Sequence, residues 1–366
     1  MEIKVITRHF PTNYGSLLQS IATQMLLTRL GHNCEIIDYV NPEEHGLRAV
    51  MNSLKSKPFW KRNLITKAAY LILRYPSEKL AEIKFAKMRN HYLRLTRRFK
   101  EGSELSDIKA DVFMTGSDQV WGPTTDKTYD PAYFLSFVKD GKKIAFASSF
   151  GKKGFADSDE RNIRKLLEDY DDIAVREDTA ISLLNSMGIK EAKQVLDPTL
   201  LIDKSEWNTL AKDEKTAKDY VLVYQLHNNP DLEHYALEFS KKVGLPLKRV
   251  SPSLHQFNRG GKFEYLPSLG HFLSLIKNCK YLITDSFHGT AFAINFNKQF
   301  IEIMPNNGTG GRNQSILKLL GLSNRIVQDV NDFSIVEEII DYNRVNQILA
   351  QERKKSIQIL GDFLKN

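Results

Sequence analysis

Short apolar runs alternate with amphipathic helical stretches from the first residues of the chain. Residues 2–8 (EIKVITR) predict a strand, residues 17–30 predict an amphipathic helix that ends at Gly31, and residues 34–40 (CEIIDYV) predict a second strand. Two strands joined by one helix are usually parallel, with a right-handed connection. The pattern therefore predicts that the chain begins with a β-α-β unit.

Four more apolar runs follow, and each contains or ends in Gly, Ser or Asp. They are DVFMTGSD at 111–118, KIAFASSFG at 143–151, DIAVRED at 172–178 and QVLDPTLLI at 194–202. Continuous apolar strands are typical of a parallel sheet that is covered on both faces and delivers polar residues at its carboxyl edge. We therefore expect a central parallel sheet in this half of the chain.

A charged stretch around Trp207 then interrupts the alternation, and we place the domain junction within 198–218. Beyond it, strands are predicted at 220–226, 245–251, 278–286, 299–304 and 325–328, with helices between most of them and a helical C-terminal stretch. The predicted fold class is α/β, with two doubly wound Rossmann-like domains facing a cleft and a basic helical excursion in the N-terminal half.

The length of 366 residues agrees with two domains, because one hydrophobic core would be stretched at this size. We expect an N-terminal domain at 1–205 and a C-terminal domain at 206–366, whose last helix packs back on the first domain. No apolar run is long enough to span a bilayer and no signal-peptide pattern is present, so we expect a cytoplasmic protein.

The cysteines and histidines of the chain predict neither a disulfide nor a metal site. Cys34 and Cys279 lie far apart in apolar settings, which favours reduced core residues. No Cys/His cluster has the spacing of a zinc site, so no metal is expected.

Positive charge is concentrated in one segment. Between Arg48 and Lys100 there are 15 lysines and arginines and 2 acids, a net +13, whereas the whole chain carries +8 and the remainder therefore −5. Aromatic residues, including Phe59 and Trp60, are interleaved with the bases. The segment suits an anionic surface such as a membrane or a phospholipid-linked substrate. It predicts peripheral docking at the inner face of the membrane, with Phe59 and Trp60 as an anchor at the headgroup level. A solvated helical surface is the alternative; nucleic acid is disfavoured, because no nucleic-acid-binding motif accompanies the charge.

Polar residues at the predicted strand ends form the candidate site of the first half. The first strand is followed by Asn13, Tyr14, Gly15 and Gln19, and a glycine turn before a helix offers N–H groups to an anion. A full dinucleotide motif is missing, although Asp38 stands where a ribose-binding acid would. The later strand ends contribute Gly116, Ser117, Asp118, Trp121 and Arg176, and Arg176 requires an anionic partner, either Glu177, Asp178 or a ligand.

The second half contributes the stretch DSFHGTAFAINFN at 285–297. Asp285, Ser286, His288 and Gly289 end a predicted strand and open a helix of small apolar residues, whose N-terminus favours an anion. A glycine-rich loop farther along carries Arg312 just before another helix. A lone histidine is more often structural than catalytic, but its place at a strand end favours ligand contact or catalysis.

The chain resembles the polysaccharide pyruvyl transferase family over most of its length. The resemblance rests on the order and spacing of several motifs: NYGSLLQSIATQMLLTRLGHNCEIIDY, GSDQVWGP, IAFASSFG, VREDT, VLDPTLL and DSFHGTAFAINFNKQF. It implies a fold similar to GT-B glycosyltransferases, and transfer of pyruvate from phosphoenolpyruvate to two hydroxyls of a sugar as a cyclic ketal. The Arg-x-His of some members is Ser286-Phe287-His288 here, so Arg312 or Arg176 would have to bind the donor.

The chemistry implied by the resemblance gives these residues roles. His288 would supply a proton or stabilise the departing phosphate, Asp118 or Asp285 would accept a hydroxyl proton, and Trp121 or Tyr14 would stack on the sugar. Neither a cofactor nor a metal is required beyond the donor phosphoenolpyruvate, and the expected acceptor is a lipid-linked precursor of a capsule or exopolysaccharide. The alternatives are a glycosyltransferase that uses a sugar nucleotide and a saccharide-binding protein without activity.

Overall fold

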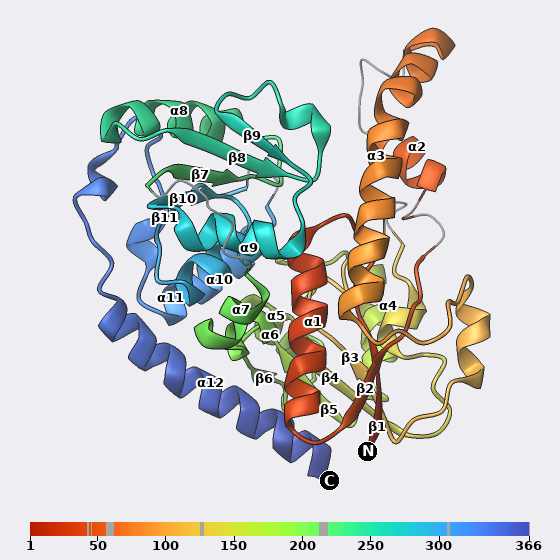
Figure 1. The fold of residues 1–366 in the computed structure, drawn as a ribbon. Helices are drawn as coiled ribbons and strands as arrows, with labels where there is room; N and C mark the ends of the chain where they lie inside the picture. Colours follow the sequence, from red (N-terminus) through yellow and green to blue (C-terminus); the bar gives the residue numbers. More distant parts are fainter. Residues whose placement is uncertain are drawn as a thin grey trace. The chain divides into compact units, whose positions relative to one another are not determined.

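The computed structural model describes residues 1–41, 44, 46–55, 62–124, 128–211, 219–305 and 308–365. The chain divides into two compact units, shown with their elements in Figure 1. Unit 1 comprises Met1–Pro198 together with Ile359–Asn366, and unit 2 comprises Thr199–Gln358. The last helix, α12 (Tyr342–Lys365), therefore begins in unit 2 and ends in unit 1.

Unit 1 is built on a parallel six-stranded sheet in the order β2-β1-β3-β4-β5-β6. Its strands are β1 (Glu2–Ile6), β2 (Asn33–Ile36), β3 (Val112–Thr115), β4 (Lys142–Ser148), β5 (Asp172–Val175) and β6 (Lys193–Gln194). All four residues of β3 are buried, as expected for a central strand covered on both faces. Its helices are α1 (Tyr14–Arg29), α2 (Gly46–Lys55), α3 (Leu64–Tyr92), α4 (Asp157–Leu167) and α5 (Asp178–Ser186).

Unit 2 is built on a parallel five-stranded sheet in the order β11-β10-β7-β8-β9. Its strands are β7 (Val221–Tyr224), β8 (Leu247–Ser251), β9 (Lys262–Tyr265), β10 (Tyr281–Thr284) and β11 (Gln299–Glu302). Two short helices precede the sheet, α6 (Pro198–Leu201) and α7 (Lys204–Leu210). The longer helices are α8 (Pro230–Val243), α9 (Leu269–Asn278), α10 (Phe287–Asn295) and α11 (Gly311–Leu319), followed by α12.

The prediction of two doubly wound α/β halves is confirmed, and three details differ. Residues 194–202 do not form one strand, because Pro198 starts helix α6 soon after the two-residue strand β6. Residues 325–328 contribute one bridge, from Ile326 to Glu302, instead of a strand. Strand β9 was not predicted, because its short KFEY sequence follows a glycine-rich turn and is only partly buried.

Both cysteines, Cys34 and Cys279, are buried free thiols, as predicted. Burial raises the pKa of each thiol to about 12, so both stay protonated at neutral pH. Among the described helices, none is both long enough and apolar enough to cross a membrane.

Candidate functional site

The strand orders locate one point in each sheet where a ligand would bind. Ligands of open parallel sheets bind beyond the carboxyl ends of two neighbouring strands whose connections leave in opposite directions. In unit 1 this point lies between β1 and β3, and in unit 2 it lies between β7 and β10. The loops and first helical turns that follow β1, β3 and β10 carry most of the residues predicted as site residues.

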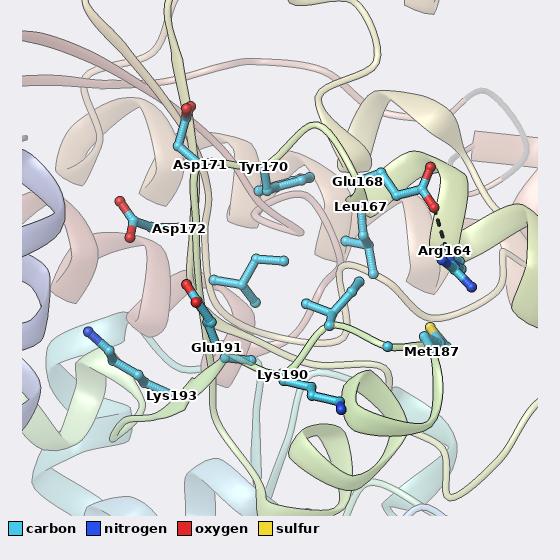
Figure 2. Close-up of a pocket in the computed structure, with 14 residues that line it drawn as sticks. Arg164, Leu167, Glu168, Tyr170, Asp171, Asp172, Met187, Lys190, Glu191 and Lys193 are labelled. Carbon is cyan, nitrogen blue, oxygen red and sulfur yellow. Dashed lines mark hydrogen bonds and ion pairs between the residues drawn. The ribbon is translucent and has the colours of Figure 1, made fainter.

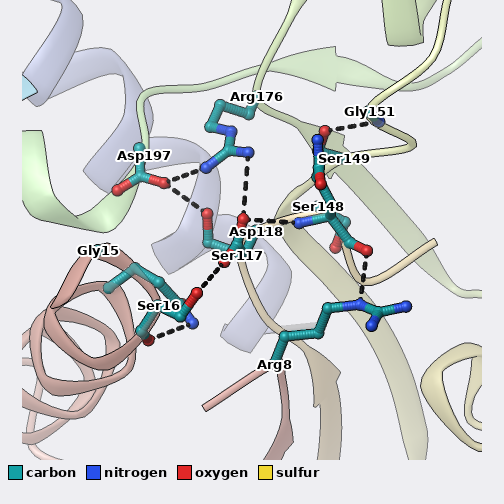
Figure 3. Close-up of polar contacts among 12 residues, drawn as sticks. Arg8, Gly15, Ser16, Ser117, Asp118, Ser148, Ser149, Gly151, Arg176 and Asp197 are labelled. Carbon is teal, nitrogen blue, oxygen red and sulfur yellow. Dashed lines mark hydrogen bonds and ion pairs between the residues drawn. The ribbon is translucent and has the colours of Figure 1, made fainter. Parts of the chain in front are cut away.

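Asp118 lies at the switch point of unit 1, on the loop after β3. Its Oδ2 accepts a hydrogen bond of 2.7 Å from Ser16 Oγ on α1, and its Oδ1 accepts one of 2.9 Å from the Gln119 backbone N–H (Figure 3). The backbone of Asp118 is left-handed, with φ 76°, which is uncommon for residues other than glycine. The side chain of Asp118 is 11% exposed, so a bound ligand can contact it.

Arg176, after β5, is held among three carboxylates. Its Nη1 donates a 2.7 Å hydrogen bond to Asp197 and its Nη2 lies 3.8 Å from Asp118 Oδ1 (Figure 3). Its Nε lies 3.7 Å from Glu177. Burial by itself would lower the pKa of Arg176, but Asp197, Glu177 and Asp118 raise it above its ordinary value. The guanidinium therefore stays charged beside Asp118, and its contact with a ligand stays a prediction.

Three residues predicted to touch substrate are core residues instead. Trp121 is 0% exposed and packs among Phe134, Phe150 and Tyr170. Tyr14 is also 0% exposed and lies against an aromatic ring of α3, so neither ring has a face on which a sugar could stack. Gln19 is buried too, and its amide donates to Thr7, Ser16 and Ser20 within unit 1.

The remaining predicted residues of unit 1 shape the switch point. Asn13 caps α1, since its side chain accepts a 2.8 Å hydrogen bond from Gly15 N. Ser117 is buried and its Oγ donates to Asp197 at 2.7 Å. A Cβ atom at Gly116 would lie 3.1 Å from Thr7 and Val5, so glycine lets β3 pass close to β1.

Arg8 lies at the switch point of unit 1 and was not predicted as a site residue, because the predicted strand at 2–8 included it, whereas β1 ends at Ile6. Its Nε donates to the Gln119 carbonyl at 2.8 Å and its Nη1 lies 2.5 Å from Glu44. Arg8 therefore fixes the loop that carries Asp118. Asp38, which a dinucleotide site would use, lies 3.2 Å from His9 Nε2 instead.

Asp285 lies at the switch point of unit 2, at the end of β10, and holds the loop after β7. It accepts hydrogen bonds from Leu226 N at 2.7 Å and His227 N at 3.0 Å, and His227 Nδ1 lies 3.2 Å from it. The side chain of Asp285 is 0% exposed, whereas that of His227 is 24% exposed. His227 was not predicted, and the structure adds it to the site as an imidazole oriented by a carboxylate.

His288 lies in the first turn of α10, which follows β10 directly. Ser286 caps this helix by accepting a hydrogen bond from Gly289 N at 3.3 Å. A Cβ atom at Gly289 would collide with the Thr284 hydroxyl, so glycine lets α10 start directly on the sheet. The helix N-terminus and a 5% exposed imidazole thus lie together at the carboxyl edge of the sheet.

Glu302, at the end of β11, is a buried acid behind this helix. It is 0% exposed, it contacts Thr290 Oγ1 on α10, and Asn313 on α11 donates a 2.5 Å hydrogen bond to it. Burial raises the pKa of Glu302 well above its ordinary value, the two hydrogen bonds lower it in part, and Asp285 raises it. We therefore expect a protonated Glu302. Arg312, next to Asn313 on α11, is half-buried at the same edge of the sheet.

The raised pKa of Glu302 gives a testable stability profile. Because the folded protein keeps this proton and the unfolded chain loses it, the free energy of unfolding falls as pH rises above 4.5, the ordinary pKa of a glutamate. The decrease is at most about 1.4 kcal/mol per pH unit and stops when the pH reaches the pKa of Glu302 in the folded protein. Glu302→Gln keeps the shape and has no proton to lose. We expect the variant to gain stability relative to wild type between pH 5 and 8 in urea unfolding; parallel curves would contradict a protonated Glu302.

The amino ends of β5 and β6 border a separate hollow of about 770 Å³ (Figure 2). Its lining includes Glu168, Asp171, Asp172, Lys190 and Lys193. Because ligands of parallel sheets bind at the carboxyl edge, this hollow lies at the wrong end of the strands for the candidate site.

Comparison with known proteins identifies one family. A sequence model of the polysaccharide pyruvyl transferase family matches residues 13–307. This range includes His288, Asp118 and the switch point of unit 2, but it begins after β1 and ends before Arg312. No curated protein matches the chain significantly in sequence.

Solved structures similar to the chain share its fold at low identity. The UDP-GlcNAc 2-epimerase of Methanocaldococcus jannaschii, in complex with UDP-GlcNAc and UDP, matches at 13% identity and TM-score 0.51 over 100% of both chains. MnaA of S. aureus with UDP matches at 14% identity and TM-score 0.50 over 96% of this chain and 91% of that one. An E. coli trehalose-6-phosphate structure bound with UDP-2-fluoro glucose matches at 9% identity and TM-score 0.53, over 100% and 99%. The fold is GT-B-like.

Proposed function

The chain belongs to the polysaccharide pyruvyl transferase family, and on that premise we propose that it transfers pyruvate from phosphoenolpyruvate to two hydroxyls of one sugar, forming a cyclic ketal and releasing phosphate. The observation that carries a catalytic role is the placement of ionisable side chains at both switch points, Asp118 in unit 1 and His227 and His288 in unit 2. We propose a saccharide precursor of a capsule or exopolysaccharide as the acceptor.

The proposed reaction balances without an electron donor or acceptor. One sugar hydroxyl attacks C2 of phosphoenolpyruvate while C3 takes a proton and becomes a methyl group. The C2–O bond to phosphate then breaks, and the second hydroxyl attacks C2 to close the ketal. Two hydroxyl protons are released; one replaces the proton given to C3 and the other leaves with phosphate. Each step needs positioned acids, bases and cations, and we propose no cofactor beyond the donor.

We propose His288 as the acid that protonates C3 or assists the departing phosphate. Histidine gains and loses a proton near neutral pH, as this role requires. Its place in the first turn of α10 puts it beside the backbone N–H groups that attract a phosphate or carboxylate. His227, which Asp285 orients, is a second imidazole at this edge of the sheet. We propose that it returns a proton to His288 or orients the His288 ring.

We propose Asp118 as the base that accepts the proton of the sugar hydroxyl. Asp285 was an equal candidate in sequence, but its side chain is 0% exposed and its oxygens are occupied by two backbone N–H groups and His227. Asp118 retains 11% exposure and lies 3.8 Å from the guanidinium of Arg176. Asp285 is therefore a positioning residue.

We propose that Arg312 binds an anionic group of the donor, because it is a half-buried cation in the first turn of α11, at the carboxyl edge of the sheet of unit 2. Arg312→Ala should raise the KM for phosphoenolpyruvate about 10-fold or more with a smaller change in kcat, and lysine should restore it only in part because the bidentate geometry is lost. Steady-state kinetics with varied donor measure this. The matched control is Lys318→Ala on the exposed side of the same helix, and an Arg312→Ala variant with unchanged KM would contradict the proposal.

One experiment separates the proposed activity from its rivals. The purified chain is incubated with phosphoenolpyruvate and candidate lipid-linked saccharides, and products are analysed by mass spectrometry together with released phosphate. Addition of one pyruvate as a ketal, with stoichiometric phosphate, supports the proposal. Release of a nucleoside diphosphate from sugar nucleotides would identify a glycosyltransferase, and binding without any product would identify a saccharide-binding protein.

We further propose that the enzyme works in the cytoplasm.

A further inference from the structure

Helix α3 has apolar residues on two opposite faces. One face is buried in unit 1 through Tyr70, Ala81, Phe85 and Met88. The other face is exposed to solvent, and its apolar residues are 47–80% exposed: Ile65, Ile72, Leu73, Leu80 and Ile83. At 100° per residue these five side chains fall within an arc of roughly 100°, so they form one continuous stripe. We call them the outer stripe.

The outer stripe is not needed to hold α3 in place. The neighbouring helix α2 packs on α3 through Val50 and Leu54, which contact the buried Tyr70. Ser53 Oγ and Tyr70 OH are 3.0 Å apart, and Gly46 N donates a 2.8 Å hydrogen bond to Glu82. The contacts between α2 and α3 therefore use the other side of α3, which extends from the sheet of unit 1 with α2 beside it (Figure 1).

The charges around the outer stripe are positive. Exposed Lys84 and Lys87 lie on the same side of α3 as the stripe. The two acidic residues of the 48–100 segment form ion pairs with basic residues of α3. Glu78 pairs with Arg74 at 2.9 Å, and Glu82 pairs with Lys79 at 3.3 Å. An apolar stripe flanked by lysines is the pattern of a helix that lies in the interface of an anionic bilayer.

Charge decides which occupant covers the stripe. A second copy of this chain would bring a segment of net +13 against another of +13, which opposes self-association through this face. An anionic bilayer offers both an apolar layer for the stripe and phosphates for the lysines. We propose that α3, supported by α2, docks the protein on an anionic lipid bilayer, with the outer stripe at the boundary between headgroups and acyl chains.

This proposal rests on the surface of unit 1 and is independent of the proposed chemistry. It also moves the anchor that the sequence suggested: Phe59 and Trp60 lie outside the described residues, whereas the outer stripe lies within them. Because docking combines apolar and charged contacts, losing either should release the protein.

Vesicle co-sedimentation of the full chain tests the proposal. The probes are vesicles of phosphatidylcholine alone and of phosphatidylcholine mixed with phosphatidylglycerol, each at low and high salt. Two variants remove one contribution each, Ile72→Ser/Leu80→Ser for the stripe and Lys84→Glu/Lys87→Glu for the charge. Lys139→Glu/Lys153→Glu, at two exposed positions elsewhere in unit 1, is the charge-matched control. Circular dichroism and melting curves verify that each variant is folded.

We expect wild type and the control to bind the anionic vesicles at low salt and to be released at high salt. Both α3 variants should partition at least about 10-fold less. Equal recovery in the supernatant with both vesicle types would overturn the proposal, as would unchanged binding of the α3 variants. A dimer in light scattering that the stripe variant dissociates would identify a second copy as the occupant and would overturn it too.

Discussion

His288→Ala is expected to lower turnover about 100-fold or more, the usual loss when a positioned acid is removed. The imidazole lies in the first turn of α10, at the carboxyl edge of the sheet of unit 2 and at its switch point. Removing it takes away a proton donor but leaves the Ser286 cap and the backbone N–H groups of α10 in place. We therefore expect the loss to fall mainly on kcat, measured as phosphate release from phosphoenolpyruvate at saturating donor.

Two further variants separate chemistry from folding. His288→Gln fills most of the same volume and can donate a hydrogen bond, but it cannot transfer a proton, so it should be nearly as inactive as the alanine variant. His234→Ala removes an exposed histidine of α8 in the same unit and should keep full activity. Both should melt close to wild type.

The comparison with His227→Ala assigns the acid. If His288 transfers the proton and His227 only supports it, His227→Ala should lose less activity than His288→Ala. Near-full activity of His288→Ala together with a 100-fold loss in His227→Ala would move the role to the imidazole that Asp285 orients. Such a result would leave the reaction class intact and correct the residue.

The edge of each sheet that carries the site could be predicted from the apolar runs. Parallel strands end at the same edge, so Asp118, Arg176 and His288, each close to the end of such a run, were expected at the carboxyl ends of the sheets. What the runs do not reveal is strand order. His227 follows β7 as plainly as His288 follows β10, but its importance depends on β7 and β10 being neighbours, which only the structure shows.

Burial was the other property that the local sequence could not supply. Trp121 and Tyr14 follow strand ends just as ligand-binding residues do, but their rings are enclosed by residues distant in sequence, such as Tyr170 and Phe85. Asp285 looked like a candidate base until its hydrogen bonds to the loop after β7 were known. These contacts join positions far apart in the chain, and no local pattern encodes them.

Asp118→Asn is expected to reduce kcat about 100-fold while the protein stays folded. The left-handed backbone at this position, with φ 76°, suits asparagine as well as aspartate. The amide oxygen can still accept the hydrogen bond from Gln119 N, and the Ser16 hydroxyl can reverse its direction, so the loop should keep its shape. What is lost is the negative charge beside Arg176 and with it the ability to accept a proton from a sugar hydroxyl.

Ser16→Ala provides the matched comparison for Asp118→Asn, because it removes only the 2.7 Å hydrogen bond to the carboxylate. If the carboxylate is the base, losing that hydrogen bond should lower kcat by less than about 10-fold, because the carboxylate itself and its hydrogen bond from Gln119 N remain. Equal losses in the two variants would mean that the loop geometry matters and the carboxylate does not. Full activity of Asp118→Asn would place the base elsewhere and leave Asp118 as the partner that holds Arg176 and Ser16 at the switch point.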